Sequence, residues 1–191
     1  MNREEYKGIV RPFLTDRRFH HSECVAEEAE RLAKHYGADP EKAWIAGMLH
    51  DITKELSREE QLKKINEFGI ILTDLEKGAP KLWHAITGAA YVRQVLHIDD
   101  PDIVDPVLYH TTARAEMTLP EKILYMADYV SADRTFDGVE ALRETAHTDL
   151  DKAVLLGCQY TIEDLVSQQR PIHPNTMAGY NWCVMKQQIS N

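Results

Sequence analysis

The sequence lacks several patterns that identify common classes of protein. Its three cysteines, Cys24, Cys158 and Cys183, show no CxxC spacing, which argues against a disulfide framework and a zinc ribbon. The phosphate-binding loops GxxxxGK and GxGxxG are absent, and so is a serine nucleophile elbow. No run approaches the ~20 apolar residues of a membrane span. The charged N-terminal segment lacks the apolar core of a signal peptide, so we expect a cytoplasmic protein without membrane contacts.

Positive charge is also scarce. The chain has 22 Lys and Arg residues against 31 Asp and Glu residues, a formal net charge of −9. A nucleic-acid polymer usually requires a basic face, so we expect none as a partner. A small phosphorylated ligand is still compatible with this charge if positive charge is concentrated locally, and metal ions are its most compact source.

Strand signals are nearly absent, whereas helical periodicity with start and stop residues runs through the chain. The sequence predicts an all-α fold and one domain over residues 1–191. Helices are expected at 3–14 and 16–36, from Pro40, from the Ser57–Glu60 capping box to Gly69, near Pro80, Pro101 and Pro120, at 149–170 as the longest, and after Pro174.

Polar residues interrupt the apolar faces of these helices at regular places. In the second helix His21 extends an apolar stripe by one turn, whereas His20 points away from it. His84 and His110 also lie on apolar faces, and an aspartate interrupts "ILYMADYV". The pair "HD" follows "AWIAGML", and adjacent residues diverge by about 100° around a helix. Both side chains therefore reach one site only near a helix end or across a cleft. The inward set is His21, His50, Asp51, His84, His110 and Asp128.

Each of these residues alone is compatible with a hydrogen-bonded core histidine or an acid paired with arginine. Together, four histidines and two aspartates in one small bundle indicate divalent metal. Imidazole and carboxylate ligands suit iron, manganese, zinc or nickel. Six ligands exceed the three or four of a catalytic zinc site and indicate two metals bridged by a carboxylate. The remaining histidines His35, His97, His147 and His173 fall near helix ends or on polar faces, where surface or capping roles are expected.

The order of these residues resembles the two-metal form of the HD-domain metal-dependent phosphohydrolases. Over nearly the whole chain the sequence is more narrowly similar to the YqeK group, the HD-type symmetrical dinucleoside tetraphosphate hydrolases. The segments that carry the similarity are "RRFHHS", "HDITK", "WHAITGA", "HTTA", "ADYVSADR", "FDGVEALR" and "IHPNTMAGYNW". The chain departs from the group at Ala113, where glycine is usual, and at Ser131-Ala132, where Glu-Pro is common. Neither departure touches an expected metal ligand.

The resemblance implies a compact HD-domain helical bundle with a metal site between helices. It implies a metal-binding core at about residues 17–130 and C-terminal helices at about 137–190 that pack on it. One metal would be held by His21, His50, Asp51 and Asp128, and the second by His84 and His110 with Asp51 bridging. Iron is the expected metal, with manganese or nickel as alternatives. The implied reaction is symmetrical cleavage of diadenosine tetraphosphate to two ADP, by attack of a metal-bridging hydroxide on phosphorus.

We expect Asp51 and Lys54 to act in catalysis, with Lys54 four residues after His50 on the same helix face. The expected substrate contacts are Arg18, Lys54, Thr53, Thr87, Thr111, Arg134 and Arg143. Several of them have alternative roles: Lys54 as a solvated lysine near a helix C-terminus, the last two arginines as surface ion-pair partners, and the threonines as caps or supports for imidazole rings.

Two other functions remain compatible with these residues. One is an HD-domain hydrolase that acts on another nucleoside phosphate, and the other is a regulatory module that binds a nucleotide without turnover. The Gly-Tyr-Pro motif of cyclic dinucleotide phosphodiesterases is absent after "HD", where "ITKELS" stands, and so is the Glu-Asp pair of alarmone hydrolases. The C-terminal segment "WCVMKQQI" is compatible with a homodimer face.

Overall fold

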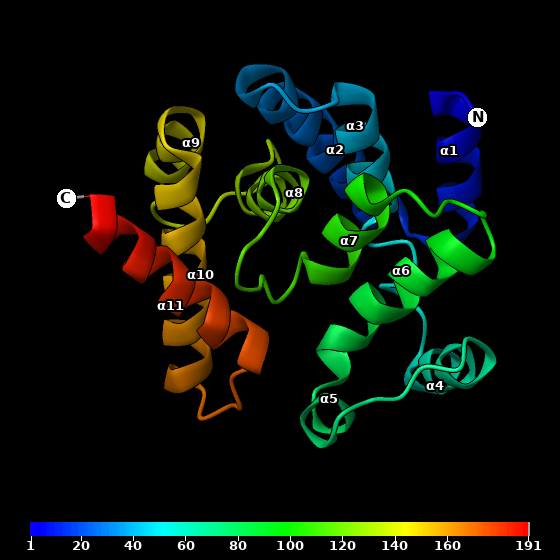
Figure 1. Cartoon of the computed structure of the whole chain (residues 1–191). Coiled ribbons are helices and arrows are strands. Elements are labelled where there is room, and N and C mark those ends of the chain that lie inside the picture. Colours follow the sequence, from blue (N-terminus) through cyan, green and yellow to red (C-terminus); the bar gives the residue numbers. More distant parts are fainter. Residues whose placement is uncertain (191) are drawn as a thin grey trace.

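The computed structural model describes residues 1–190, which form helices and the turns between them (Figure 1). No β-strand occurs in this range, so the all-α prediction is confirmed. The helices are α1 (Arg3–Val10), α2 (Asp16–Tyr36), α3 (Pro40–Leu49), α4 (Arg58–Glu67), α5 (Asp74–Gly78), α6 (Trp83–Gln94), α7 (Pro101–Tyr109), α8 (Leu119–Val130), α9 (Val139–Thr148), α10 (Leu150–Ser167) and α11 (Pro174–Ser190), with short 3₁₀ helices η1 (Arg11–Phe13) and η2 (Pro80–Leu82).

Side-chain caps set the helix starts that the sequence predicts. The Ser57 side chain accepts from the backbone of Glu60, and the Glu60 carboxylate accepts in return from the Ser57 N–H, which forms the expected capping box of α4. Thr15 caps α2, and Asp39 caps α3 ahead of Pro40. The starts of α2, α3 and α4 are therefore set by the local sequence.

Some helix lengths differ from the prediction. The first helix ends at Val10 rather than near residue 14, because Pro12 lacks an N–H donor and the chain continues as η1. The longest helix among the described residues is α2 with 21 residues, not α10 with 18. The short helix α5 was not expected.

Helix α8 lies in the middle of the molecule, with α2, α3 and α7 on one side and α9 and α10 on the other (Figure 1). Its residues Ile123, Leu124, Met126 and Ala127 are at most 1% exposed and belong to the main hydrophobic core. This placement brings Asp128 on α8 to the helices that carry the predicted histidines.

The helices α2 and α3 cross at very short range. A Cβ atom on Gly47 would lie 2.6 Å from the Cα atom of Ala26, so this crossing requires glycine. Because the backbones approach closely, the His21 and His50 rings lie 5.4 Å apart.

The C-terminal helix α11 docks against the turn that follows α7. The Thr176 hydroxyl donates to the Thr112 carbonyl at 2.8 Å, and Gly179 lies against the backbone of Arg114. Within residues 1–190, none of the helices has the length and apolar character needed to cross a membrane.

Candidate metal centre

The HD pair lies at the end of helix α3. The helix ends at Leu49, His50 is its C-cap residue, and Asp51 begins the following turn. Adjacent residues within a helix point in different directions, but at this helix end both side chains reach the same site, as expected from the sequence. The His50 Nδ1–H donates to the Gly47 carbonyl at 2.6 Å, which leaves the lone pair on Nε2 directed into the centre.

His110 ends helix α7 in the same manner. Its Nδ1–H donates to the Val107 carbonyl at 2.7 Å, three residues back, so its Nε2 atom also faces inward. This Nε2 atom lies 3.1 Å from the Nε2 atom of His84 on α6. Both rings are nearly fully buried, at 3% and 2% residue exposure.

The two carboxylate oxygens of Asp51 face different sets of ligand atoms. Its Oδ1 atom lies 3.2 Å from His84 Nε2 and 3.7 Å from His110 Nε2. Its Oδ2 atom lies 3.4 Å from His50 Nε2 and 3.0 Å from Arg18 Nη1. A carboxylate in this position is suited to bridge two cations.

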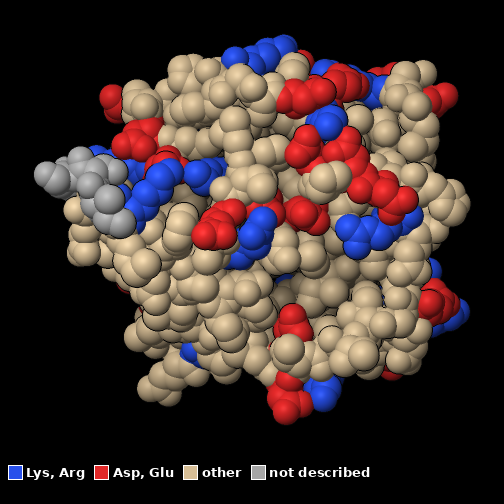
Figure 2. Space-filling model, in the orientation of Figure 1, with Lys and Arg blue, Asp and Glu red and all other residues tan. Residues whose placement is uncertain are grey.

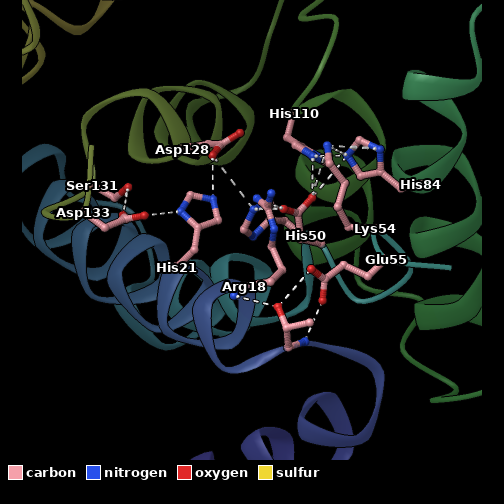
Figure 3. Close-up of polar contacts among 12 residues, drawn as sticks. Arg18, His21, His50, Lys54, Glu55, His84, His110, Asp128, Ser131 and Asp133 are labelled. Carbon is pink, nitrogen blue, oxygen red and sulfur yellow. Dashed lines mark hydrogen bonds and ion pairs between the residues drawn. The ribbon is translucent and has the colours of Figure 1, made fainter. Parts of the chain in front are cut away.

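The second aspartate, Asp128, faces the other side of the cluster. Its Oδ1 atom lies 3.1 Å from His21 Nε2 and 4.0 Å from His50 Nε2 (Figure 3). His20 is exposed and its ring contacts Cys24, so the structure places His21 inside and His20 outside, as the helical periodicity predicts.

The cluster divides into three overlapping groups of possible ligand atoms, each with its atoms within 4.8 Å of one another. They are His21, His50 and Asp51; His50, His110 and Asp128; and Asp51, His84 and His110. All six residues expected as ligands belong to at least one group, and Asp51 belongs to two.

The atoms of this cluster fit a divalent metal. The His50 Nε2 and Asp51 Oδ1 atoms are buried without a hydrogen-bond partner in the described structure, an arrangement that is costly unless a cation binds them. Oxygen and imidazole nitrogen are the donors, and all cysteines lie outside the three groups. Hard and intermediate divalent ions such as iron, manganese or nickel suit this donor set.

The ionisation of these residues also favours cation binding. Burial alone would raise the pKa of Asp51, but His50, His110 and His84 hold that pKa well below its usual value. For Asp128, burial again raises the pKa, and the His21 contact and the Arg134 charge outweigh it. Burial lowers the pKa of His84 to about 4, so its ring is neutral at neutral pH and can act as a ligand.

Three cationic side chains border the cluster. Arg18 contacts Asp51, and Arg134 contacts both the carboxylate and the backbone carbonyl of Asp128. The Lys54 ammonium lies 3.1 Å from His84 Nε2 and 3.9 Å from Asp51 Oδ1. Burial lowers the pKa of Lys54, and the two nearby carboxylates oppose that effect.

The prediction that Lys54 shares a helix face with His50 was wrong. Helix α3 ends before both residues, and Lys54 lies in a turn in which its N–H donates to the Asp51 carbonyl at 2.8 Å. The Lys54 side chain still reaches the cluster because the turn folds back toward α6. Its place at the site therefore depends on tertiary structure rather than on helical spacing.

The threonines expected to contact substrate separate into two kinds. Thr53 and Thr87 are at most 1% exposed, and their hydroxyls bond to one another at 2.9 Å. Thr53 also donates to the His84 carbonyl at 2.9 Å, so this pair supports the backbone of a cluster residue. This contact agrees with the alternative role of the threonines as supports for the histidines. Thr111 instead lines a cavity beside the cluster, and its buried hydroxyl has no hydrogen-bond partner in the described structure.

Arg143 is not brought to the cluster. Its guanidinium donates to the carbonyls of Val130, Ser131 and Arg134, at 2.7 to 2.8 Å. The side chain also contacts Glu140, which agrees with the ion-pair role given above as the alternative for Arg143. Arg143 thus shapes the loop that carries Arg134.

Two acidic residues next to the centre were missed by the sequence reasoning. Asp133 Oδ2 accepts from His21 Nδ1–H at 2.8 Å, and the Ser131 hydroxyl holds the other oxygen at 2.7 Å (Figure 3). Glu55 accepts from the N–H and hydroxyl of Thr15 at 2.6 and 3.0 Å, which ties the turn after Asp51 to the start of α2. The sequence offered one signal for these two acids, which is that each lies within a few residues of a cluster aspartate.

A helical bundle whose buried histidines and aspartates can hold divalent metal, bordered by cationic side chains, is suited to metal-dependent hydrolysis of phosphate esters and anhydrides. The sequence profile of the HD domain family matches residues 18–133. The chain therefore belongs to the HD domain family.

Relatives match along nearly the whole chain. "Bis(5'-nucleosyl)-tetraphosphatase, symmetrical" of Bacillus subtilis is 40% identical, over 96% of this chain and 98% of the relative. The protein of the same name from Halalkalibacterium halodurans is 40% identical over 98% and 100%. The crystal structure of a "predicted HD superfamily hydrolase involved in NAD metabolism" from Clostridium acetobutylicum has a TM-score of 0.93 and 34% identity, and the match covers 97% of this chain and 98% of that one.

Proposed function

We propose that this protein hydrolyses diadenosine tetraphosphate symmetrically and releases two molecules of ADP. The observation that carries the proposal is the pair of relatives named symmetrical bis(5'-nucleosyl)-tetraphosphatase, each 40% identical over nearly its full length. The geometry of the centre supports the same reaction class, because hydrolysis at phosphorus is commonly assisted by paired metal ions.

We propose two divalent metal ions as cofactors, with iron first and manganese or nickel as alternatives. His21, His50, Asp51 and Asp128 would hold one ion, and His84 and His110 the other, with Asp51 shared between them. The two-sided contacts of the Asp51 carboxylate support this division. The chemistry supplied by bound ions is a lowered pKa of water and stabilisation of negative charge on the phosphoryl oxygens.

The protein's own residues would orient the tetraphosphate and compensate its charge. Lys54 lies within 4 Å of the shared aspartate and is placed to contact a phosphoryl oxygen near it. Arg18 and Arg134 offer planar sets of donors on the other side of the cluster, where a second phosphate would lie. The free hydroxyl of Thr111 is available to donate to the same chain of phosphates.

Chromatography of the products tests the proposal. Purified protein of measured metal content is given diadenosine tetraphosphate with Fe²⁺ or Mn²⁺, with and without chelator. ADP as the only product, lost with chelator, is the expected result. ATP plus AMP would overturn symmetrical cleavage. No turnover by protein that holds its metals would favour another nucleoside phosphate or a binding module.

The remaining predictions from the sequence stay predictions. They are the cytoplasmic location, the organisation of residues 1–191 as one domain, the possible homodimer, and the absence of a nucleic-acid partner.

A further inference from the structure

A cavity of about 620 Å³ opens directly beside the metal centre, and Figure 2 shows this face of the molecule hollowed near its middle. Lys54 and His84 line the cavity where it meets the centre. One wall comes from the end of α5 through η2, and the opposite wall comes from the second half of α10 and its connection to α11. The cavity is called the α10 cavity below.

A smaller hollow of about 370 Å³ joins the α10 cavity to the other side of the centre. It is lined by His110, Asp128 and Arg134. The two hollows have four lining residues in common: Thr111, Tyr129, Phe136 and Thr161. A ligand in the α10 cavity can therefore extend to the cluster without leaving the protein surface.

The charge of the α10 cavity differs from that of the whole protein. Three cationic residues line it, Lys54, Lys81 and Arg170, against two acidic residues, Asp137 and Asp164, in a chain of net charge −9. The side chains of Lys81 and Arg170 form no ion pair or hydrogen bond with any described residue. Cationic side chains without an ion-pair partner, at a cavity next to the candidate metal centre, favour an anionic ligand.

The α10 cavity also carries two aromatic side chains that the core does not cover. Phe136 in the α8–α9 loop is 39% exposed and Tyr160 on α10 is 38% exposed, and both line the cavity. Tyr129 lines it as well, but its hydroxyl is held by the Gly157 carbonyl at 3.1 Å. Exposed aromatic rings beside cationic groups are suited to stack on a nucleobase whose phosphates meet the cations.

We propose that the α10 cavity holds one nucleoside end of the substrate, with the base against Phe136 and Tyr160. The phosphate chain then passes Lys54 to the metal centre, and Lys81 and Arg170 add positive charge along the cavity. The inference rests on the proposed function, because it names the subsite for half of a dinucleoside polyphosphate. The cavity volume lies in the range of about 300–1,000 Å³ of pockets that bury a ligand of this size.

Two measurements on the metal-loaded protein test the subsite. The first is calorimetric binding of ADP, which needs no turnover, and the second is KM and kcat for diadenosine tetraphosphate. Tyr160→Ala and Phe136→Ala should each weaken ADP binding and raise KM by about fivefold or more, the effect of losing one stacking contact. The kcat value should change much less, because neither residue belongs to the three groups of candidate metal ligands.

Control variants separate stacking from folding and from charge. Val166→Ala removes an exposed apolar side chain of α10 that lies outside the cavity. This variant should leave the ADP affinity and KM unchanged. Tyr160→Phe keeps the ring and should retain most of the affinity. Inorganic tripolyphosphate, which has no base, should inhibit Tyr160→Ala as well as the wild type, whereas Lys81→Ala and Arg170→Ala should weaken that inhibition.

The outcomes distinguish this inference from the proposed function. Cleavage to ADP with unchanged KM and unchanged ADP binding in both aromatic variants would overturn the subsite and leave the reaction standing. ADP binding that depends on the aromatic residues, in a protein that does not cleave diadenosine tetraphosphate, would support the subsite and overturn the reaction. Each variant is accepted only if its thermal midpoint matches that of the wild type.

Discussion

Three histidines of the candidate metal centre are positioned through the ring nitrogen that faces away from it. His50 and His110 use backbone carbonyls of their own helices, whereas His21 uses the Asp133 carboxylate. A carboxylate partner fixes the tautomer and raises the basicity of the ring more than a carbonyl does. Asp133 is therefore a positioning residue for His21.

Replacing Asp133 tests this role through metal affinity. Asp133→Ala should lower the affinity for the added divalent ion by about 10–100-fold, the usual effect of losing an outer partner of a histidine ligand. Asp133→Asn keeps an acceptor and should restore part of it. Competition with a coloured chelator measures the affinity. Asp99→Ala, at an exposed acid in the α6–α7 loop, is the matched control. Equal affinities in Asp133→Ala and Asp99→Ala would contradict the role.

The adjacent histidines of α2 give a second test at single residues. His20→Ala should leave metal content and turnover close to the wild type, because the residue is exposed and its ring points toward Cys24 rather than the cluster. His21→Ala should lose metal, because the ring is 4% exposed and faces Asp128. Metal analysis and activity of the two purified variants make the comparison. An inactive His20→Ala with a normal His21→Ala would reverse the assignment.

The cluster residues were predictable from sequence because they interrupt apolar helix faces or follow them directly. Asp133 was not, because it lies in the turn after α8, where no periodicity indicates direction. Thr53 and Thr87 have the residue type and the chain position of substrate contacts. Their burial behind His84 is decided by how α4 and α6 pack, which local sequence does not specify.

At the scale of elements, the crossing of α2 and α3 sets the distance between the first two histidines. Gly47→Ala would place a methyl group 2.6 Å from the Ala26 backbone, so the helices must separate. We expect a loss of about 1–3 kcal/mol in the free energy of unfolding, the usual cost of overpacking. Because the Gly47 carbonyl also accepts from His50, metal affinity should fall as well.

Urea unfolding and metal competition measure the two effects of Gly47→Ala. Gly8→Ala in α1 is the control, since a methyl group there meets no atom within 4 Å and alanine favours a helix. Gly47→Ala as stable as Gly8→Ala would show that the crossing does not constrain the centre.

Element starts could be predicted because caps and prolines act locally, as Ser57 and Pro40 show. Element ends were less predictable. Helix α1 ends at Val10, two residues before Pro12, and α3 ends at Leu49, after which Glu55 ties the following turn to Thr15. The wrong prediction that Lys54 and His50 share a helix face follows from the early end of α3 at Leu49.

For the whole molecule, an ion-pair group ties the N-terminal helix to the bundle. Arg3 on α1 contacts Glu30 on α2 at 2.9 Å and Glu41 on α3 at 2.6 Å. The contacts with Arg3 and then Lys34 lower the pKa of Glu30 from 4.5 to about 2. Since the folded pKa is the lower one, ionised Glu30 stabilises the fold above about pH 4.5, and this contribution is lost as the pH falls toward 2.

Glu30→Gln should therefore be less stable than the wild type near pH 7, by about 1 kcal/mol for a partly exposed pair. The difference should shrink as the pH falls from 4.5 toward 2, where the wild-type carboxylate becomes protonated. Chemical denaturation of both proteins at a series of pH values measures it. A difference that is constant over this range would mean that the charge of Glu30 is not the stabilising feature.

The α10 cavity is a property of the whole molecule that sequence reasoning did not predict. Its lining comes from α5, the α8–α9 loop, α10 and the start of α11, which are distant along the chain. Phe136 begins the segment "FDGVEALR" and Tyr160 lies on α10, and only the packed structure places both on one cavity. The cluster residues could be predicted from the apolar faces of single helices. The cavity could not, because its lining is brought together only by the tertiary fold.

The number and position of bound metal ions test the central claim most directly. Inductively coupled plasma mass spectrometry of the purified protein gives the number of ions, and anomalous diffraction from its crystals gives their positions. We predict two ions per chain with the Asp51 carboxylate between them, and loss of bound metal in Asp51→Ala with an unchanged helical circular dichroism spectrum. A single ion, or two ions with Asp51 bound to neither or to only one, would contradict the bridged centre.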